Sequence, residues 1–294
     1  MNSKQILQKA IIELKKSNKP TPELDSKILL GYILGKNKKV YLHENIMISE
    51  EDRVKYEKII KIRAKGKPVS RILKKRNFWN FDFSITSFTL DPRAESELLV
   101  EVVLQYFKDK NTNLQILDLG SGSGCLGLSI AKELPMSTLV NVDACKKALN
   151  QVKINSKKLE IFSRNQFIHA NWFNKNWTTK INSYVSKSKN KNNYKFDLIV
   201  CNPPYIKSKI ISKLQDEVKK YDPILALDGG EDGCDSYRAI FSNIRDLLSK
   251  DGVIVIEVGY DILKTVKKII KNSGFKILKI YKDILGIDRT LLIK

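Results

Sequence analysis

The tetrapeptide Asn202-Pro203-Pro204-Tyr205 carries residue types suited to holding a planar amide or an exocyclic base amine. The Asn202 side chain offers an acceptor oxygen, and the Pro203 carbonyl offers another with no competing N–H beside it. Together they can accept both hydrogens of an NH2 group, while the Tyr205 ring can cover the flat group that carries this nitrogen. We therefore predict a substrate site at these four residues, with Asn202, Pro203 and Tyr205 in catalytic roles.

The residues before this tetrapeptide predict the element that positions it. The apolar run from Phe196 to Cys201 is typical of a buried parallel strand, and the two prolines force the chain out into a stiff loop. Asn202 would then lie at the carboxyl edge of a sheet, where open α/β folds bind their ligands. Because Asn and Pro are also ordinary turn residues, a purely structural turn is the alternative.

A second motif is a glycine-rich loop between the apolar run 114–119 and an expected helix from Cys125 to Leu134. Glycines let a ligand approach the backbone, and free N–H groups at a helix start favour an anionic group. Asp143 ends the next expected strand about 20 residues further on, where a carboxylate can accept ribose hydroxyls. The loop consists of Gly120, Ser121, Gly122, Ser123 and Gly124.

The glycine loop is compatible with two cofactors. Its glycines, with Gly127, satisfy the dinucleotide spacing G-x-G-x-x-G, which is a weak indication of a nicotinamide enzyme. Asp118 before the loop and the downstream NPPY favour S-adenosylmethionine instead. Trp172 follows a further expected strand and is placed to flank an adenine ring, although a buried structural indole is an equal alternative.

Charge and composition narrow the function further. The formal charge is +21, but only nine of the 53 basic residues are arginines, whereas phosphate-reading surfaces favour arginine. The charge thus agrees with work near RNA or the ribosome without indicating nucleic acid as the substrate. Two histidines and four cysteines without C-x-x-C spacing predict neither a histidine triad nor a metal site. No apolar run reaches the roughly 18 residues of a membrane span, so we expect a cytoplasmic protein without a membrane partner.

The periodicity of apolar residues divides the chain into three parts. Residues 1–75 predict a small helical domain, with Ser3 and Ser49 as helix caps, and alternation in residues 76–90 predicts a β-hairpin linker. Residues 91–294 predict an α/β domain with a doubly wound, mostly parallel seven-stranded sheet and an antiparallel last strand. Within it, residues 174–195 are rich in Lys, Asn and Ser and predict a solvated or disordered insert, or alternatively a nucleic-acid arm.

Over nearly its whole length the chain resembles the HemK/PrmC family of protein-(glutamine-N5) methyltransferases, which modify peptide chain release factors. DLGSGSG alone indicates a class I methyltransferase, and NPPY is shared with enzymes that methylate amino groups of nucleic acids. The downstream segments make the likeness specific. The matching stretches are, in order, RAKGKPVSRI, DPRAESELLVE, DLGSGSG, VDACKKAL, NWF, NPPY, YDPILALDGGEDGCDSYR and KDILGIDR.

The resemblance implies a function and a set of site residues. It implies transfer of a methyl group from S-adenosylmethionine to the side-chain nitrogen of the glutamine in the GGQ motif of class-1 release factors, supporting translation termination. Residues 120–124, Asp143, Trp172 and Asn202 would bind the cofactor, and residues 202–205 would hold the glutamine amide. The helical domain would select the substrate.

Two alternatives remain beside this function. A nucleic-acid amino methyltransferase, acting on N6 of adenine or N4 of cytosine, shares NPPY and suits the positive charge. A non-catalytic protein with the same fold would bind S-adenosylmethionine without turnover. Three residues also depart from the family pattern, namely Ala94 in place of Pro, Arg71 near an aromatic position, and Asn171 in place of an acid. Because Asn171 keeps an acceptor oxygen but lacks a charge, we expect weaker cofactor affinity.

Overall fold

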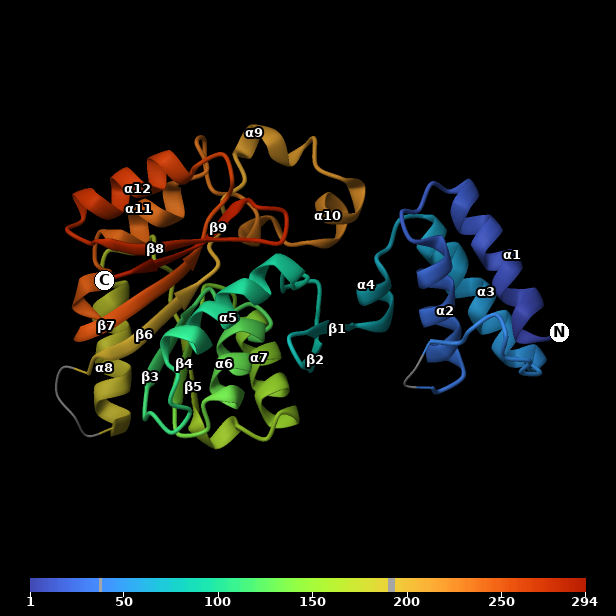
Figure 1. Ribbon diagram of the computed structural model, residues 1–294, viewed down its shortest axis with the longest axis horizontal. Helices are drawn as coiled ribbons and strands as arrows, with labels where there is room; N and C mark the ends of the chain where they lie inside the picture. Colours follow the sequence, from blue (N-terminus) through green and yellow to red (C-terminus); the bar gives the residue numbers. More distant parts are fainter. Residues whose placement is uncertain (37–38, 190–193) are drawn as a thin grey trace. The chain divides into compact units, whose positions relative to one another are not determined.

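The computed structural model describes residues 1–36, 39–189 and 194–294, which form two compact units (Figure 1). The first unit is Met1–Lys75 together with Gln215–Tyr221, and the second is Arg76–Leu214 together with Asp222–Lys294. A short segment after NPPY therefore packs with the N-terminal residues. Among the described helices, none has both the length and the apolar character that a membrane span requires.

The first unit is a small helical bundle around its own apolar core. Its helices are α1 (Ser3–Lys16), α2 (Pro22–Ile33), α3 (Glu50–Ala64), α4 (Val69–Leu73) and α10 (Asp216–Tyr221). Ser49 caps α3 as predicted, since its hydroxyl accepts from Asp52 N at 3.1 Å. The cap predicted at Ser3 is wrong because Asn2 accepts from Gln5 N at 2.9 Å, while the Ser3 hydroxyl donates to the Glu44 carbonyl. The core side chains include Leu7, Leu14, Leu29, Leu30, Tyr56 and Ile60.

A buried ion pair joins three elements of this unit. Arg63 of α3 donates to Asp25 of α2 at 2.7 Å and to Glu217 of α10 at 2.6 Å. The Arg63 side chain is only 3% exposed, so these two carboxylates, rather than water, stabilise its positive charge. This pairing explains why the segment Gln215–Tyr221 belongs to the helical unit.

The second unit is built on a seven-stranded sheet in the order β5-β4-β3-β6-β7-β9-β8. All neighbouring strands are parallel except β9, which is antiparallel to both β7 and β8. This confirms the predicted fold class, including its antiparallel last strand. The strands are β3 (Gln115–Leu119), β4 (Thr138–Asp143), β5 (Asn165–His169), β6 (Phe196–Cys201), β7 (Leu248–Glu257), β8 (Ile277–Lys282) and β9 (Asp288–Ile293).

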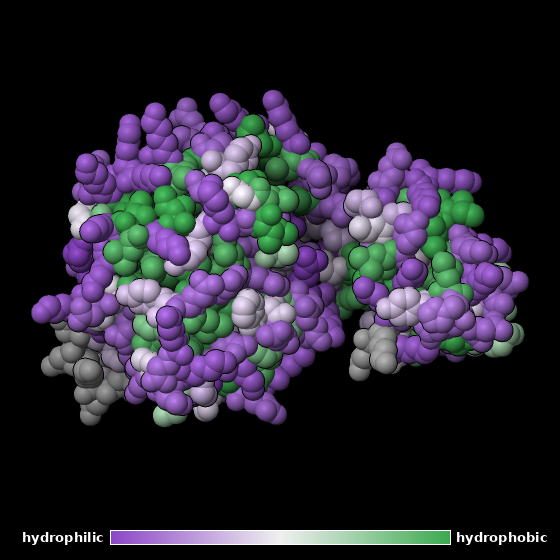
Figure 2. Space-filling model, viewed as in Figure 1, coloured by the Kyte–Doolittle hydropathy of each residue, from purple (hydrophilic) through white to green (hydrophobic). Residues whose placement is uncertain are grey.

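Helices cover both faces of this sheet because its strands are apolar on both sides. In β6, Leu198 and Val200 pack with α5 (Glu97–Tyr106), α6 (Cys125–Glu133) and α7 (Lys146–Lys158). The alternate residues Ile199 and Cys201 pack on the other face, with α8 (Trp177–Lys189), α11 (Asp235–Phe241) and α12 (Leu263–Asn272). On the face shown in Figure 2, hydrophilic side chains predominate, with patches of hydrophobic surface between them.

The predicted hairpin consists of β1 (Lys75–Phe78) and β2 (Phe81–Ser84), with its turn at Trp79 and Asn80. Phe78 and Phe83 are buried in the core on the α5–α7 face of the sheet. Asn155 of α7 fixes β2 by accepting from Ser84 N and donating to Ser84 O, both at 2.9 Å. The hairpin is thus part of the second unit's packing.

Two predictions for this unit are wrong. The solvated insert predicted at residues 174–195 contains helix α8, because Trp177, Ile181 and Val185 recur every four residues and are buried in the core. Residues 190–193 of that prediction lie outside the described residues. The helix expected up to Leu248 ends at Phe241, and a short 3-10 turn, Ile244–Asp246, leads directly into β7. The remaining short helices are Ala94–Ser96, Phe162–Arg164, α9 (Ser208–Ile211) and Ile224–Ala226.

Candidate active site

The predicted site residues meet where the order of the sheet reverses. Leu119 of β3 pairs with Cys201 of β6, so Gly120 and Asn202 leave neighbouring strands at the same carboxyl edge. Chain connections run outward in opposite directions from this point, which leaves a crevice. A cavity of about 710 Å³ occupies the edge. Its lining includes Gly120, Ser121, Gly122, Ser123, Asp143, Asn171, Trp172, Asn202 and Pro204.

Gly120 fits its position for two reasons. Its φ of +74° favours glycine, and a Cβ there would stand 3.0 Å from Cη2 and 3.2 Å from Cζ3 of Trp172. The indole therefore lies directly against the glycine loop and forms part of the cavity wall. Gly124, by contrast, is the residue before α6 and does not line the cavity.

Asp143 is held by the backbone on both carboxylate oxygens. Oδ2 accepts from Gly122 N at 2.8 Å, and Oδ1 accepts from Cys145 N at 2.7 Å. Burial raises the pKa of this carboxyl, and the two backbone hydrogen bonds counteract that effect. Each oxygen keeps a second lone pair, so Asp143 can still accept hydroxyl groups from a ligand in the cavity.

Asp118 is more deeply buried than Asp143. Its Oδ2 accepts from Gly127 N at 3.1 Å, whereas its Oδ1 has no hydrogen-bond partner among the described residues. Burial raises the pKa of Asp118 to about 7. The glycine loop therefore begins two residues beyond a carboxyl group whose charge changes near neutral pH.

Asn202 is fixed by a chain of side-chain hydrogen bonds. Its Nδ2 donates to Ser96 Oγ at 3.0 Å, and Ser96 Oγ donates to Glu257 Oε2 at 2.5 Å. Tyr205 Oη donates to the other oxygen of Glu257 at 3.1 Å. Burial raises the pKa values of both Glu257 and Tyr205, so the Tyr205 hydroxyl remains a donor at neutral pH.

The NPPY residues differ in their access to the cavity. Asn202 and Pro204 line it, whereas Pro203 and Tyr205 do not belong to its described lining. The Tyr205 ring packs against Gly259, where a Cβ would stand 2.9 Å from the ring. The structure thus gives Tyr205 a contact that its sequence position did not indicate, and its predicted role of covering the substrate stays a prediction.

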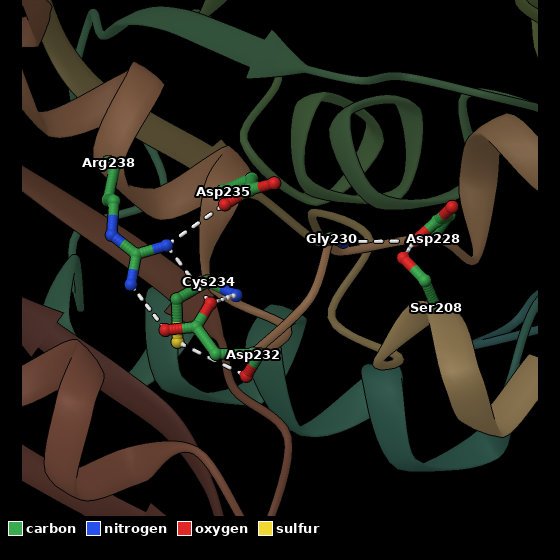
Figure 3. A network of polar contacts seen from close by, with 7 residues as sticks. All are labelled: Ser208, Asp228, Gly230, Asp232, Cys234, Asp235 and Arg238. Atoms are coloured by element: carbon green, nitrogen blue, oxygen red, sulfur yellow. Dashed lines mark hydrogen bonds and ion pairs between the residues drawn. The ribbon is translucent and has the colours of Figure 1, made fainter.

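A glycine-rich turn, residues 228–233, packs against the backbone at the end of the NPPY segment. Gly229 N donates to Ile206 O at 2.8 Å, and a Cβ on Gly233 would stand 2.6 Å from the Tyr205 carbonyl oxygen. The turn itself is tied by acidic side chains (Figure 3). Asp228 accepts from Ser208 Oγ at 2.7 Å and from Gly230 N at 2.9 Å. In the same network, Arg238 donates to Asp232 at 3.0 Å and to Asp235 at 2.9 Å.

The mouth of the cavity carries exposed apolar side chains. Ile224 and Leu225 are 61% and 57% exposed, and Phe88 and Phe173 are also exposed, yet all four line the cavity. Of the described residues in this lining, Arg93 is the only basic one, and it pairs with Asp222. The mouth therefore suits a partner with apolar or small uncharged groups better than a polyanion.

Comparison with known proteins identifies the family. Residues 5–73 match the family model described as the PrmC N-terminal domain, and residues 93–220 match the Methyltransferase small domain. The Release factor glutamine methyltransferase of Clostridium acetobutylicum is 36% identical over 99% of this chain and 98% of its own length. The chain belongs to the release factor glutamine methyltransferase family. The enzyme of the same name from Agrobacterium fabrum is 32% identical over 92% of this chain and 89% of its own.

Some relatives of this methyltransferase are longer proteins. The Bifunctional methyltransferase of Rickettsia conorii is 31% identical over 98% of this chain, which spans 57% of that protein.

The sequence did not predict two residues of this methyltransferase site, Ser96 and Glu257. Ser96 lies 106 residues before Asn202, and Glu257 lies 161 residues after Ser96. A signal was present for Glu257, because an acidic residue that ends an apolar strand run (GVIVIE) is placed at the same sheet edge as Asn202. Ser96 had no comparable signal.

Proposed function

We propose that this protein transfers a methyl group from S-adenosylmethionine to the side-chain nitrogen, N5, of the glutamine in the GGQ motif of class-1 peptide chain release factors. The observation that carries the proposal is the position of Asn202. Its side chain lines the cavity directly beside the glycine loop, so a substrate amide there would lie next to a cofactor held by that loop.

The groups that line the cavity suit the parts of S-adenosylmethionine. Gly120 leaves space beside Trp172 that a side chain would fill, and Asp143 retains lone pairs for ribose hydroxyls. Trp172 offers an aromatic face for the adenine ring. Asn171 lines the same wall, and its Oδ1 already accepts from Phe173 N at 2.9 Å. Residues 120–123, Asp143, Trp172 and Asn202 would hold the cofactor, which supplies an activated methyl group when bound, whereas Gly124, predicted with them, lies outside the described lining of the cavity.

The chain's own contribution to methyl transfer is positioning. An amide nitrogen is a poor nucleophile because its lone pair is delocalised, so fixed geometry must supply much of the rate. Asn202 Oδ1 and the Pro203 carbonyl would accept the two amide hydrogens of glutamine. These hydrogen bonds would orient the nitrogen and stabilise the positive charge that develops on it. The nitrogen would be acidic once methylated and would release one of its two protons to solvent. Pro204 and Tyr205 would complete the substrate-binding segment.

The chemistry of the cavity mouth supports a protein substrate over nucleic acid. Ile224 and Leu225 are exposed at the mouth, and the only basic side chain in the described lining is already paired. A nucleic-acid substrate would gain most from unpaired cations near its phosphates. A flexible loop of small residues that carries a glutamine can enter such an opening without a phosphate-binding surface.

The helical N-terminal unit, residues 1–75, would select the protein substrate. Its core is closed by its own apolar residues, so it is a separate body that can present a surface to a folded partner. The hairpin region 76–90 would link it to the methyltransferase domain at 91–294.

A methyl-transfer assay tests the proposal. The purified protein is incubated with methyl-labelled S-adenosylmethionine and a class-1 release factor, with RNA and DNA in parallel. We expect label in the release factor and none in the same factor with the GGQ glutamine replaced by alanine. Label in nucleic acid alone would reject the proposed substrate and favour amino methylation of bases.

A further inference from the structure

Glu257 is a buried carboxylate that is linked to both ends of the NPPY segment, directly to Tyr205 and through Ser96 to Asn202. It ends β7 beside β6, because Cys201 pairs with Ile256. One of its oxygens accepts from Ser96, the partner of Asn202, and the other accepts from Tyr205. The side chain is almost fully buried, with Glu257 1% exposed and Ser96 3% exposed. The transfer step proposed above does not itself use this carboxylate.

The Ser96 hydroxyl determines which way the Asn202 amide faces. A serine has one hydrogen to donate and two lone pairs with which to accept. Because Ser96 donates its hydrogen to the Glu257 carboxylate, it can only accept from Asn202. The amide nitrogen of Asn202 must therefore face Ser96, and its oxygen has no hydrogen-bond partner among the described residues.

We propose that Glu257 is a positioning residue that, through Ser96, fixes the Asn202 side chain with its amide oxygen presented to the NH2 group of the substrate. The inference rests on the proposed function, since it assigns that oxygen to a glutamine amide. In the opposite orientation the Asn202 NH2 group would face the substrate NH2 group, and two donors would meet without an acceptor. The hydrogen bonds from Asn202 to Ser96 and from Ser96 to Glu257, here called the relay, thus secure the orientation on which substrate binding depends.

The direction of the relay depends on the charge of Glu257. A protonated carboxyl group can donate to Ser96, which frees the serine hydrogen to turn toward the Asn202 oxygen and allows the amide to flip. Burial raises the pKa of Glu257, so the protonated form grows as pH falls toward this raised value. The ionisable groups around it are Glu95, Cys125, Cys201, Tyr205, Tyr237 and Arg289, of which Arg289 stabilises the carboxylate.

The variants Ser96→Ala and Glu257→Gln test the relay in the full-length protein. Transfer from labelled S-adenosylmethionine to a release factor is followed from pH 5.5 to 9. The turnover number kcat is calculated per protein molecule that binds the cofactor, so that misfolded protein is not counted. We expect kcat to fall on the order of tenfold to a hundredfold in both variants, because the amide is no longer held in one orientation. The Kd of S-adenosylmethionine should change less than about twofold. In the wild type we expect kcat to decline at acid pH, because protonation of Glu257 lets the Asn202 amide flip. This decline should disappear in Ser96→Ala.

Ser137→Ala is the matched control, because Ser137 is equally buried, donates to Leu134 O at 2.7 Å and precedes β4 at the opposite edge of the sheet. Its kcat for each binding site should equal that of the wild type. Wild-type kcat in Ser96→Ala, an acid decline retained in that variant, or an equal loss in Ser137→Ala would each overturn the relay. Failure of the wild type to methylate the release factor would instead reject the proposed function, and the relay with it.

Discussion

Leu119 and Cys201 are paired at the centre of the sheet, and the chain leaves both strands at the same edge. The glycine loop follows the first residue and NPPY follows the second. Because side chains alternate along a strand, this register also sets which residues of β3 and β6 face each layer of helices. The geometry of the candidate site therefore depends on strand pairing, which sets the distance between the two loops.

The contact between Gly233 and Tyr205 should be sensitive to a single methyl group. Gly233 has a φ of +82°, and a Cβ would stand 2.6 Å from the Tyr205 carbonyl oxygen. We expect Gly233→Ala to lower the free energy of unfolding by about 2–4 kcal/mol, from backbone strain plus overpacking, and to reduce methyl transfer. Gly286→Ala is the control, because its φ is +77° but a Cβ there would have no atom of the described residues within 4 Å, apart from those of its chain neighbours. Equal effects in urea denaturation would show that the Tyr205 contact is unimportant.

Asp118 should make the protein less stable as pH rises. Its pKa is about 7 in the folded state against 3.8 as the ordinary value, so the folded state binds this proton more tightly. The free energy of unfolding should therefore decrease between about pH 4 and pH 7. Relative to Asp118→Asn, the wild type should lose about 2 kcal/mol between pH 5.5 and pH 8. Denaturation curves with the same pH dependence in both proteins would contradict this.

Arg63 should be far more important for stability than Arg53 on the same helix. Arg63 is buried with Asp25 and Glu217, so Arg63→Ala leaves Asp25 as a buried charge without its partner. We expect a loss of about 3–5 kcal/mol. Arg53 pairs with Glu50 and Glu57 at the surface, where solvent screens the charges, so Arg53→Ala should cost far less. Thermal denaturation of the two variants measures this difference. Similar decreases in Tm would show that burial does not make Arg63 more important than Arg53.

Removal of residues 1–75 should separate cofactor binding from substrate selection. The cavity is lined by residues of the second unit, so the truncated protein should bind S-adenosylmethionine with a Kd close to that of the full chain. Methylation of the intact release factor should fall, whereas a short peptide containing GGQ should be methylated at a similar rate by both proteins. Undiminished activity of the truncated protein on the release factor would refute the assigned role of the helical unit.

The sequence predicted those parts of the structure that depend on local patterns. The run Phe196 to Cys201 with its prolines located β6 and Asn202 correctly, because apolar content and Pro-Pro are short-range features. Helix α8 was not predicted because the many lysines and asparagines around Trp177, Ile181 and Val185 made the segment appear polar. The burial of these three side chains depends on tertiary packing. The Ser96–Glu257 relay joins residues 161 positions apart, which no local pattern reveals.

Fragment mass spectrometry of the reacted release factor is the sharpest test of whether Asn202 holds the glutamine amide for methylation. The wild type should add a single methyl group to the side-chain nitrogen of the GGQ glutamine. Asn202→Ala, which removes the acceptor oxygen, should lower turnover on the order of a hundredfold to a thousandfold, while Asn202→Asp, which keeps an acceptor, should be affected less. A methyl group at another atom, or near-normal turnover by Asn202→Ala at saturating S-adenosylmethionine, would rule out this role of Asn202.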